Sequence, residues 1–315
     1  MKRLSIVLAL AGLAVSALLV LRYDAAQVLG VALSVGWRGF GLLVLWQGAL
    51  FLVLGFAWSV VLPGVWPPLL LWGRVVRDAA TTCLPFSPVG GYVLGARAVT
   101  VGGVAWPTAA AGTVVDVTAE IIGQFLFSVF GLAALLSLRP ESPYVLPVGL
   151  GLVAVALAIG AGLRGRAPIG RALGAIGGRL LGGWFRGQGG LDRVGEELTR
   201  LYANPKRLLL GSALHLLGWF GTGLGTWISL RLLGWEADLL PILALEALLD
   251  ALIGAAFVVP GAAGVQEAGY VGLGAAFGVP PDVALGVSLL RRARDLALGL
   301  PILLVFQWIE LRRIR

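Results

Sequence analysis

The segment from Phe40 to Leu62 reads FGLLVLWQGALFLVLGFAWSVVL and contains no charged side chain. A helix needs about 20 apolar residues to cross the hydrocarbon core of a bilayer. A second uncharged run extends from Leu208 to Leu230. The whole chain of 315 residues is 58% hydrophobic and only 13% charged, whereas soluble domains carry about 25% charge. These values exclude a disordered chain and argue against a water-soluble enzyme. We therefore predict an all-α, polytopic integral membrane protein.

About eight transmembrane helices are expected from the lengths of the apolar runs. The run that begins at Leu4 resembles a signal peptide, with Ala14–Ala17 as a small-residue cleavage site. Because the apolar run continues to Leu21, an uncleaved first helix is favoured. The expected spans are Leu4–Leu21, Phe40–Leu62, Trp106–Leu138, Tyr144–Leu163, Leu208–Leu230, Leu239–Val259, the short Val265–Val279 and Asp282–Ile309. Trp106–Leu138 exceeds one span, so it is either one long tilted helix or two short ones.

Two stretches are too rich in glycine and proline for an ordinary spanning helix. They cover residues 81–97 and 260–281. Irregular backbone at membrane depth persists only where protein covers it or a water-filled cavity lies beside it. Both stretches are therefore interpreted as re-entrant or broken segments.

The chain divides into a transmembrane half (1–163), a basic loop (164–207) and a second transmembrane half (208–315), all within one membrane domain. Each half contains one of the broken stretches, with charged residues on both sides of it. Two apolar halves interrupted at corresponding places are typical of transporters built from inverted repeats, with a substrate site at the membrane midplane.

Residues 164–207 hold nine basic and three acidic residues. Such a loop is expected in the cytoplasm, as are both termini, because lysine and arginine favour that side of the membrane. The arginine-rich, glycine-rich composition suggests a bacterial protein, and hence an inner-membrane location. Apolar residues recur at helical spacing within the loop, notably Leu191, Val194, Leu198 and Leu201. This pattern predicts either an amphipathic helix on anionic lipid or a solvated loop with helical pieces.

Ionisable residues inside the apolar segments are the candidates for function, because each costs several kcal/mol in lipid unless it faces a cavity or a partner. They form two groups, one in each half, which also include Asp78, Glu246 and Asp250. The residues expected to line a head-group cavity are Arg77, Arg97, Asp116, Glu120, Pro260, Gly261, Gly264, Glu267, Arg291, Arg292, Arg294 and Asp295. Arginine presents a planar fork of donors suited to phosphate or carboxylate. The helix after Gly264 would add free N–H groups. Interhelical ion pairs that only fix packing are the alternative.

The sequence gives little support for a metal, cofactor, nucleotide or nucleic-acid site. Cys83 is the only cysteine and His215 the only histidine, so we expect no metal and no cofactor. A lone histidine in an apolar run is usually a hydrogen-bonded core residue. The glycines at 221, 223 and 225 lack the spacing of a nucleotide-binding loop, and the scattered basic residues do not indicate nucleic-acid binding.

The C-terminal third carries the most specific motifs. These are Glu246–Asp250 (EALLD), Pro260–Glu267 (PGAAGVQE), Ser288–Asp295 (SLLRRARD) and Gly299–Pro301 (GLP). Together they resemble the flippase-like membrane-domain family named for the lysylphosphatidylglycerol synthase transmembrane region. Asp116–Gln124 (DVTAEIIGQ) is similar to the hopanoid-biosynthesis-associated, HpnL-like branch. The family commonly has Gly-Gly after the proline, whereas Gly261 is followed here by Ala262.

The resemblance implies an integral membrane protein that moves a polar lipid, hopanoid-related or an aminoacyl- or glyco-phospholipid, across the inner membrane. In relatives that are enzymes a separate soluble domain makes the lipid, and because this chain lacks such a domain no enzymatic activity is expected. The alternative is a non-transporting subunit that docks lipid-biosynthetic enzymes. Membrane lipids, such enzymes and further copies of the chain are the expected partners. Alanine at Glu267 or Arg291 is expected to abolish lipid movement and to leave expression intact.

Overall fold

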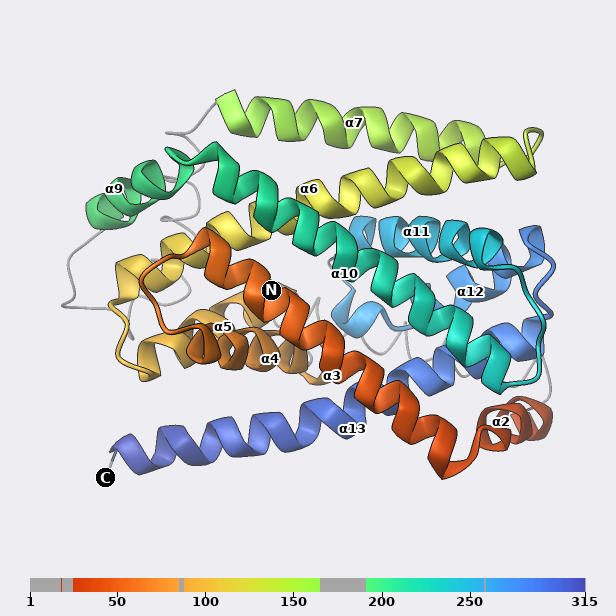
Figure 1. Cartoon of the computed structure of the whole chain (residues 1–315). Helices are drawn as coiled ribbons and strands as arrows, with labels where there is room; N and C mark the ends of the chain where they lie inside the picture. The colour runs from red at the N-terminus through yellow and green to blue at the C-terminus, as the bar shows by residue number, and fades with distance from the viewer. Residues whose placement is uncertain (1–17, 19–24, 85–87, 165–190, 258, 315) are drawn as a thin grey trace.

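The computed structural model describes residue 18 and residues 25–84, 88–164, 191–257 and 259–314, and this part of the chain is helical apart from short connections. In chain order the elements are α2 (Ala25–Ser34), α3 (Gly36–Val61), α4 (Pro67–Cys83), α5 (Pro88–Val101), α6 (Trp106–Leu138), α7 (Val145–Arg164), α9 (Leu191–Tyr202), α10 (Pro205–Leu232), α11 (Leu239–Ala255), the 3-10 turn η1 (Pro260–Ala262), α12 (Val265–Ala276) and α13 (Pro281–Ile314) (Figure 1). The predicted all-α class is confirmed. The predicted first span, Leu4–Leu21, lies almost entirely outside the described residues.

Proline and glycine mark most of the helix boundaries. Five helices have proline at their first or second position, where the missing N–H needs no partner: Pro67, Pro88, Pro107, Pro205 and Pro281. Glycines with positive φ follow α3, α5, α10 and α12, because glycine adopts the left-handed conformation without steric cost: Gly64, Gly103, Gly234 and Gly278. The short helix α2 was not predicted, and Gly36, with φ 64°, marks the start of α3 after it.

Three helices in the described part of the chain are long and apolar enough to cross a membrane: α3, α6 and α10. The single 33-residue helix α6 shows that the two-helix alternative for Trp106–Leu138 was wrong. Around the predicted breaks, α4 and α5 have 17 and 14 residues, and α11 and α12 have 17 and 12. All four are shorter than the roughly 20 residues that a full crossing needs. This length favours re-entrant pairs, so the polytopic class is confirmed while the number of eight spans stays a prediction.

The second half repeats the helix lengths of the first. Helices α3 and α10 have 26 and 28 residues, α4 and α11 have 17 each, and α6 and α13 have 33 and 34. In Figure 1, α3 and α10 lie side by side at the centre and run in opposite directions, while α6 and α13 run in opposite directions on either side of them. A half-turn about an axis between α3 and α10 exchanges α3 with α10 and α6 with α13. This arrangement supports the predicted inverted repeat.

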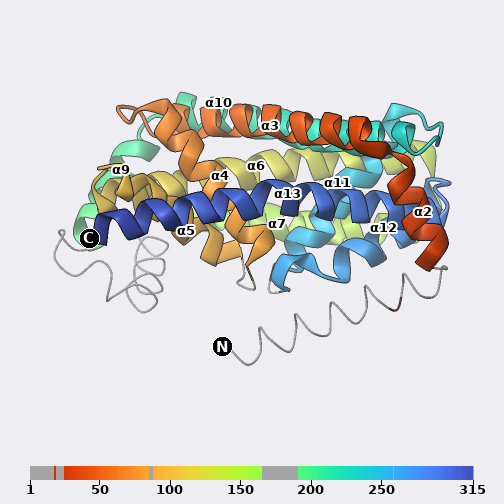
Figure 2. The ribbon, with the colours of Figure 1, turned by 90° about the horizontal axis from the view of Figure 1, so that it is seen from below.

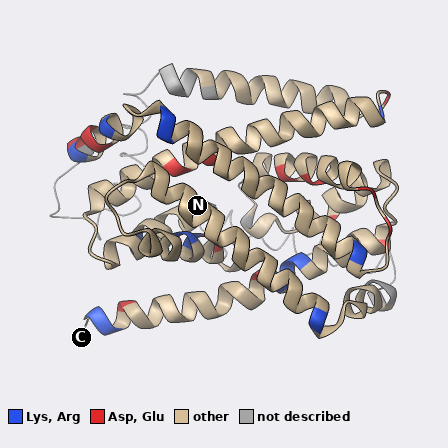
Figure 3. Ribbon diagram, viewed as in Figure 1, with Lys and Arg blue, Asp and Glu red and all other residues tan. Residues whose placement is uncertain are grey.

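Each half has its own apolar core. One cluster joins α3, α4, α5 and α6 through buried residues such as Trp58 and Leu70. The other joins α10, α11, α12 and α13 with one residue of α6, through residues such as Leu245 and Tyr270. Figure 3 shows that charged residues lie mainly at the ends of the long helices or in the centre of the molecule. The polar centre therefore lies between two apolar bodies.

Helix α9 has the predicted amphipathic pattern, but its apolar face contacts protein. Val194, Leu198 and Leu201 are buried in the core of the first half, and α9 packs on α6. Tyr202 and Thr118 share a hydrogen bond of 2.7 Å between their hydroxyl groups. For this helix the proposed contact with lipid was therefore wrong, and the rest of the predicted loop, residues 165–190, lies outside the described residues. Helix α9 and the end of α13 lie at the same end of the molecule (Figure 2).

Two glycines of the predicted broken segment 81–97 lie inside a helix and let it pack closely against its neighbour. Gly91 and Gly95 lie within helix α5. A Cβ on Gly91 would lie 2.8 Å from the carbonyl oxygen of Arg77, and one on Gly95 would lie 2.9 Å from that of Gly73. Helices α4 and α5 thus pack almost backbone to backbone. Helix α4 ends at Cys83 and α5 begins at Pro88, and residues 85–87 between them lie outside the described residues.

Gly123 allows a similar approach of α6 to α10. An added Cβ would lie 2.9 Å from the backbone nitrogen of Leu216 and 3.0 Å from the carbonyl oxygen of Ser212. We expect Gly123→Ala to destabilise the protein by about 1–3 kcal/mol, because neither backbone can yield without moving a helix. The measurement is the thermal unfolding midpoint in detergent. Gly48→Ala is the matched control, since a Cβ on Gly48 meets nothing within 4 Å; equal effects of the two variants would contradict the prediction.

Candidate functional site

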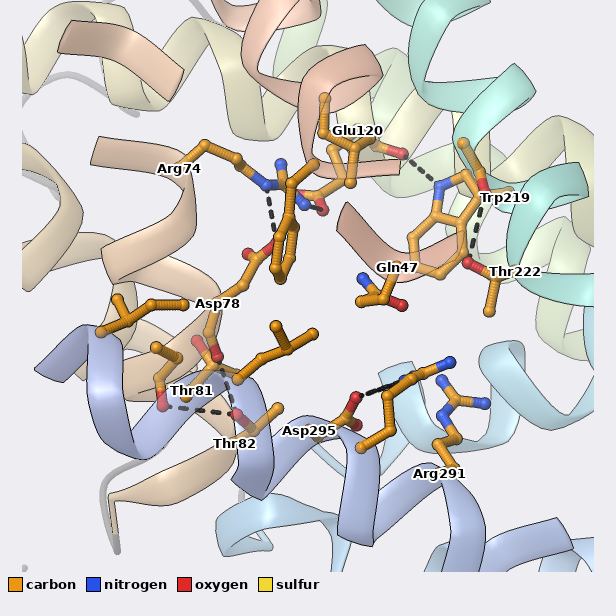
Figure 4. A pocket seen from close by; sticks show the side chains of 18 of the residues that line it. Gln47, Arg74, Asp78, Thr81, Thr82, Glu120, Trp219, Thr222, Arg291 and Asp295 are labelled. Atoms are coloured by element: carbon orange, nitrogen blue, oxygen red, sulfur yellow. Dashed lines mark hydrogen bonds and ion pairs between the residues drawn. The ribbon is translucent and has the colours of Figure 1, made fainter. Parts of the chain in front are cut away.

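A cavity of about 240 Å³, lined by both polar and apolar side chains, lies between the two halves. Its walls come from α3 and α4 of the first half, α10 and α13 of the second, and one residue of α6 (Figure 4). Phe51, Leu54, Leu298 and Ile302 provide apolar surface. The polar side chains of the lining are Gln47, Arg74, Asp78, Thr81, Thr82, Glu120, His215, Trp219, Thr222, Arg291, Arg294 and Asp295.

The cavity lies near the middle of the membrane-crossing helices. Gln47 lies about 16 Å from the start of α3 and about 21 Å from its end, at 1.5 Å per residue. Trp219 lies about 20 Å from either end of α10 by the same measure. Because the hydrocarbon core is about 30 Å thick, helices that cross it with their centres at its midplane would place these side chains near that midplane. Charged groups at this depth need partners.

On the side of the first half, two arginines of α4 bind two carboxylates of α6. Arg77 Nη1 lies 2.7 Å from Asp116 Oδ2, and Arg77 Nη2 contacts Glu120. Arg74 donates to Glu120 at 2.9 Å and to Asp78 at 3.0 Å. The Arg77 guanidinium also lies 4.3 Å from the centroid of the Tyr92 ring. Both arginines are buried, so this cluster ties α4 to α6 at one wall of the cavity.

His215 belongs to the same cluster. Its Nε2 lies 3.0 Å from Asp116 Oδ1, and both side chains are almost completely buried. Its Nδ1 has no hydrogen-bond partner among the described residues. The prediction of a hydrogen-bonded core histidine is confirmed, and in addition the ring lines the cavity.

On the side of the second half, the arginine comes from the long helix and the carboxylates come from the short one. Arg291 of α13 contacts Glu246 of α11 through Nη1 and lies 3.3 Å from Asp250 Oδ1 through Nη2. Glu246 also accepts hydrogen bonds from Thr226 at 2.8 Å and from Tyr270 at 3.0 Å. This cluster ties α11 to α13, as the first ties α4 to α6.

The two clusters occupy matching positions in the repeat. Arg74 and Asp78 are residues 8 and 12 of α4, and Glu246 and Asp250 are residues 8 and 12 of α11. Asp116 and Glu120 are residues 11 and 15 of α6, and Arg291 and Asp295 are residues 11 and 15 of α13. At two of these four pairs of positions the charge is inverted. Each half therefore forms the same contact between its short and its long helix with opposite polarity.

A separate buried network holds the break between α11 and α12, away from the cavity. Arg292 binds Glu267 at 2.5 and 3.1 Å and donates to the carbonyl oxygen of Gly261 at 3.2 Å. Glu267 accepts from the backbone N–H of Gly264 at 2.9 Å. Glu267 therefore caps the N–H group of Gly264, and the expectation that the N–H groups at the start of α12 bind a ligand stays a prediction. Pro260 lies in the 3-10 turn η1 of this break.

Arg294 and Asp295 differ from the other cavity charges. Arg294 donates to Asp295 Oδ1 at 2.9 Å through Nε and at 2.7 Å through Nη2, and both residues are on α13. No contact with a second helix is needed to hold this pair. It can therefore open toward a ligand without separating two helices.

The chain can now be compared with known proteins. Residues 6–302 match the family described as the lysylphosphatidylglycerol synthase TM region. The chain belongs to this family. No significant similarity to a curated protein or to a solved structure was found. The family match identifies a membrane protein tied to lipid handling. It leaves the hopanoid-associated branch as a prediction.

Within this family member, four predicted site residues line the cavity: Glu120, Arg291, Arg294 and Asp295. Arg77 and Asp116 lie behind it in the buried cluster of the first half. The remaining predicted residues lie elsewhere, either at the break after α11 (Pro260, Gly261, Gly264, Glu267 and Arg292) or at the surface of α5. There Arg97, with 34% of its side chain exposed, pairs with Glu310 at 2.6 Å.

Several lining residues were not proposed as cavity residues from the sequence. Arg74 and Asp78 are next to Arg77, and the four-residue spacing of Arg74 and Asp78 matches that of Glu246 and Asp250. This match was a usable signal. Gln47, Thr81, Thr82, Trp219 and Thr222 line the cavity only because α3, α4 and α10 meet there, and nothing in their local sequence marks them.

Proposed function

We propose that the protein moves a polar lipid across the bilayer by passing its head group through this cavity while the acyl tails stay in the membrane. The observation that carries the proposal is a cavity at mid-depth whose lining holds guanidinium groups and carboxylates from both halves of an inverted repeat. In transporters with inverted repeats the substrate site lies at this place. A lipid-handling membrane family supports a lipid as the cargo.

Arg294 and Asp295 are the partners that we assign to the head group. Their mutual ion pair lies within one helix and faces the cavity, so a phosphate can replace Asp295 as the partner of Arg294. A bidentate arginine–phosphate contact is well matched in geometry. The other cavity arginines, Arg74 and Arg291, are occupied in holding pairs of helices together.

Purified protein in phospholipid vesicles provides the test. The probe is phosphatidylethanolamine with a fluorophore on one acyl chain, and bleaching of the outer leaflet reports the movement between leaflets. We expect the double variant Arg294→Gln/Asp295→Asn to slow lipid movement about tenfold or more, as loss of one charge-assisted contact of about 1.5–3 kcal/mol implies. Arg231→Gln, at a surface residue with 43% of its side chain exposed, should move lipid as the unchanged protein does.

Two results would contradict the proposal. Lipid movement equal to that of protein-free vesicles would favour the non-transporting subunit, and a stoichiometric complex with a lipid-modifying enzyme would then be the expected finding. Unchanged movement in a folded double variant would exclude Arg294 and Asp295 as head-group partners. The same assay with hopanoid and aminoacylated lipids tests the narrower predictions about the cargo.

A further inference from the structure

The charged cluster of the first half contains one carboxylate more than it contains guanidinium groups. Its cluster holds two guanidinium groups, of Arg74 and Arg77, against three carboxylates, of Asp78, Asp116 and Glu120. One formal negative charge therefore remains while His215 is neutral. An unbalanced charge in a low-dielectric interior costs several kcal/mol. Protonation of His215, which lies 3.0 Å from Asp116, would remove this charge.

We propose that His215 and Asp116 form a proton-binding site and that its protonation is coupled to lipid movement. The coupling rests on the proposed transport function, whereas the proton site itself does not. Histidine is the side chain that ordinarily changes charge between about pH 5 and 8. Because Nδ1 of His215 has no partner among the described residues, the ring can gain or lose a proton there without breaking another hydrogen bond.

Asp116 links this site to the wall of the cavity. Its Oδ1 faces His215 and its Oδ2 faces Arg77, which in turn holds Glu120. A charged imidazole adds a third positive group beside the carboxylates that Arg74 and Arg77 already bind. Protonation therefore changes the charge balance of the contact between α4 and α6 at the point where these helices line the cavity.

Other charged groups surround the histidine from each neighbouring helix. From α6 and α4 these are the carboxylates and arginines of its own cluster. Across the cavity, α13 presents Arg291, Arg294 and Asp295, and α11 presents Glu246 and Asp250 behind Arg291. Helix α3 contributes Gln47, which does not titrate. The cavity joins His215 to both sets of charges, so a head group and a proton can influence each other's binding.

The site breaks the symmetry of the repeat. Helix α3 corresponds to α10, yet α3 carries no titratable side chain from Gly39 to Val61. The second half has an arginine, Arg291, where the first has Asp116. The histidine–aspartate pair therefore has no counterpart among the described residues of the second half, where Glu246 and Asp250 share Arg291. Such asymmetry is what a cycle needs if proton movement is to set the direction of lipid movement.

The single histidine makes the proton site directly measurable. Full-length protein without a histidine tag, labelled with ¹⁵N-histidine, gives the imidazole signal of one residue in nuclear magnetic resonance spectra of the protein in vesicles. A proton site predicts that both the charged and the neutral imidazole appear as the pH of the sample is varied, and that Asp116→Asn changes the balance between them, because the carboxylate 3.0 Å from Nε2 is gone. A signal that stays in one form at every pH at which the protein remains folded would overturn the proposal without need of any variant.

Vesicles with a pH gradient test the coupling. A gradient of one pH unit should shift the leaflet ratio of the labelled phosphatidylethanolamine by up to about tenfold for each coupled proton, and His215→Gln should abolish this shift. Glutamine can still hydrogen-bond to Asp116 but does not take up a proton. Lipid movement that ignores the gradient in the unchanged protein would overturn the coupling and leave the transport function standing. Absence of any lipid movement would refute the transport function and with it the coupling, while the resonance experiment would still decide the proton site.

Discussion

Replacement of Arg77 by leucine is expected to cost about 3–5 kcal/mol of folding free energy, since it removes one of the two guanidinium groups that balance the carboxylates of this cluster. Arg77 binds both Asp116 and Glu120, and only 2% of its side chain is exposed. Arg74, which binds Glu120 and Asp78 and lies 3.6 Å from Asp116 Oδ2, would then be the one guanidinium left for three carboxylates. Such a loss is a large part of the stability of a typical domain. Fluorescence-detected size-exclusion chromatography after heating in detergent measures it.

Two further variants separate the loss of charge balance from the loss of side-chain volume. Arg77→Leu/Asp116→Asn removes one charge of each sign and should recover at least half of the lost stability. Arg97→Leu removes a partly exposed arginine from its pair with Glu310 and should cost at most about 1 kcal/mol. If Arg77→Leu were no worse than Arg97→Leu, the buried cluster would not stabilise the contact between α4 and α6.

Arg291→Leu is expected to be comparably severe in the second half. It leaves Glu246 and Asp250 buried, with 0% and 3% of their side chains exposed, and we again expect a loss of about 3–5 kcal/mol. From the sequence we expected alanine at Arg291 to leave expression intact. The structure changes this expectation: a variant that lacks the Arg291 side chain should lose folded protein. Glu267, which binds Arg292 at the break, is likewise expected to act on the fold.

The conservative variant Arg291→Lys shows whether charge alone suffices. Lysine keeps the positive charge but lacks the planar fork that lets one arginine contact Glu246 and Asp250 through separate nitrogens. Its thermal unfolding midpoint should lie between those of the unchanged protein and Arg291→Leu. A lysine variant as stable as the unchanged protein would show that the two-nitrogen geometry contributes nothing.

The sequence alone was sufficient for the class of the protein and for most of its helices. Runs such as Phe40–Leu62 can bury their backbone polar groups only as helices in lipid, so their structure depends little on the rest of the chain. Proline and glycine then mark the ends of these helices within a few residues. The family motifs and the two charged groups could also be found, because charge in an apolar segment is rare.

Only the tertiary structure decided which charges share the cavity. Arg97 and Arg74 look equivalent in the sequence, yet one pairs at the surface with Glu310 and the other lines the cavity. The apolar face of α9 contacts α6 and not lipid. The spacing of its apolar residues is the same for both kinds of contact, so the sequence could not decide between them. The partner of His215 is Asp116, 99 residues earlier in the chain. Composition and periodicity determine which segments are buried; which side chains meet depends on the packing of the two halves, because ion pairs form between helices that are distant in the sequence.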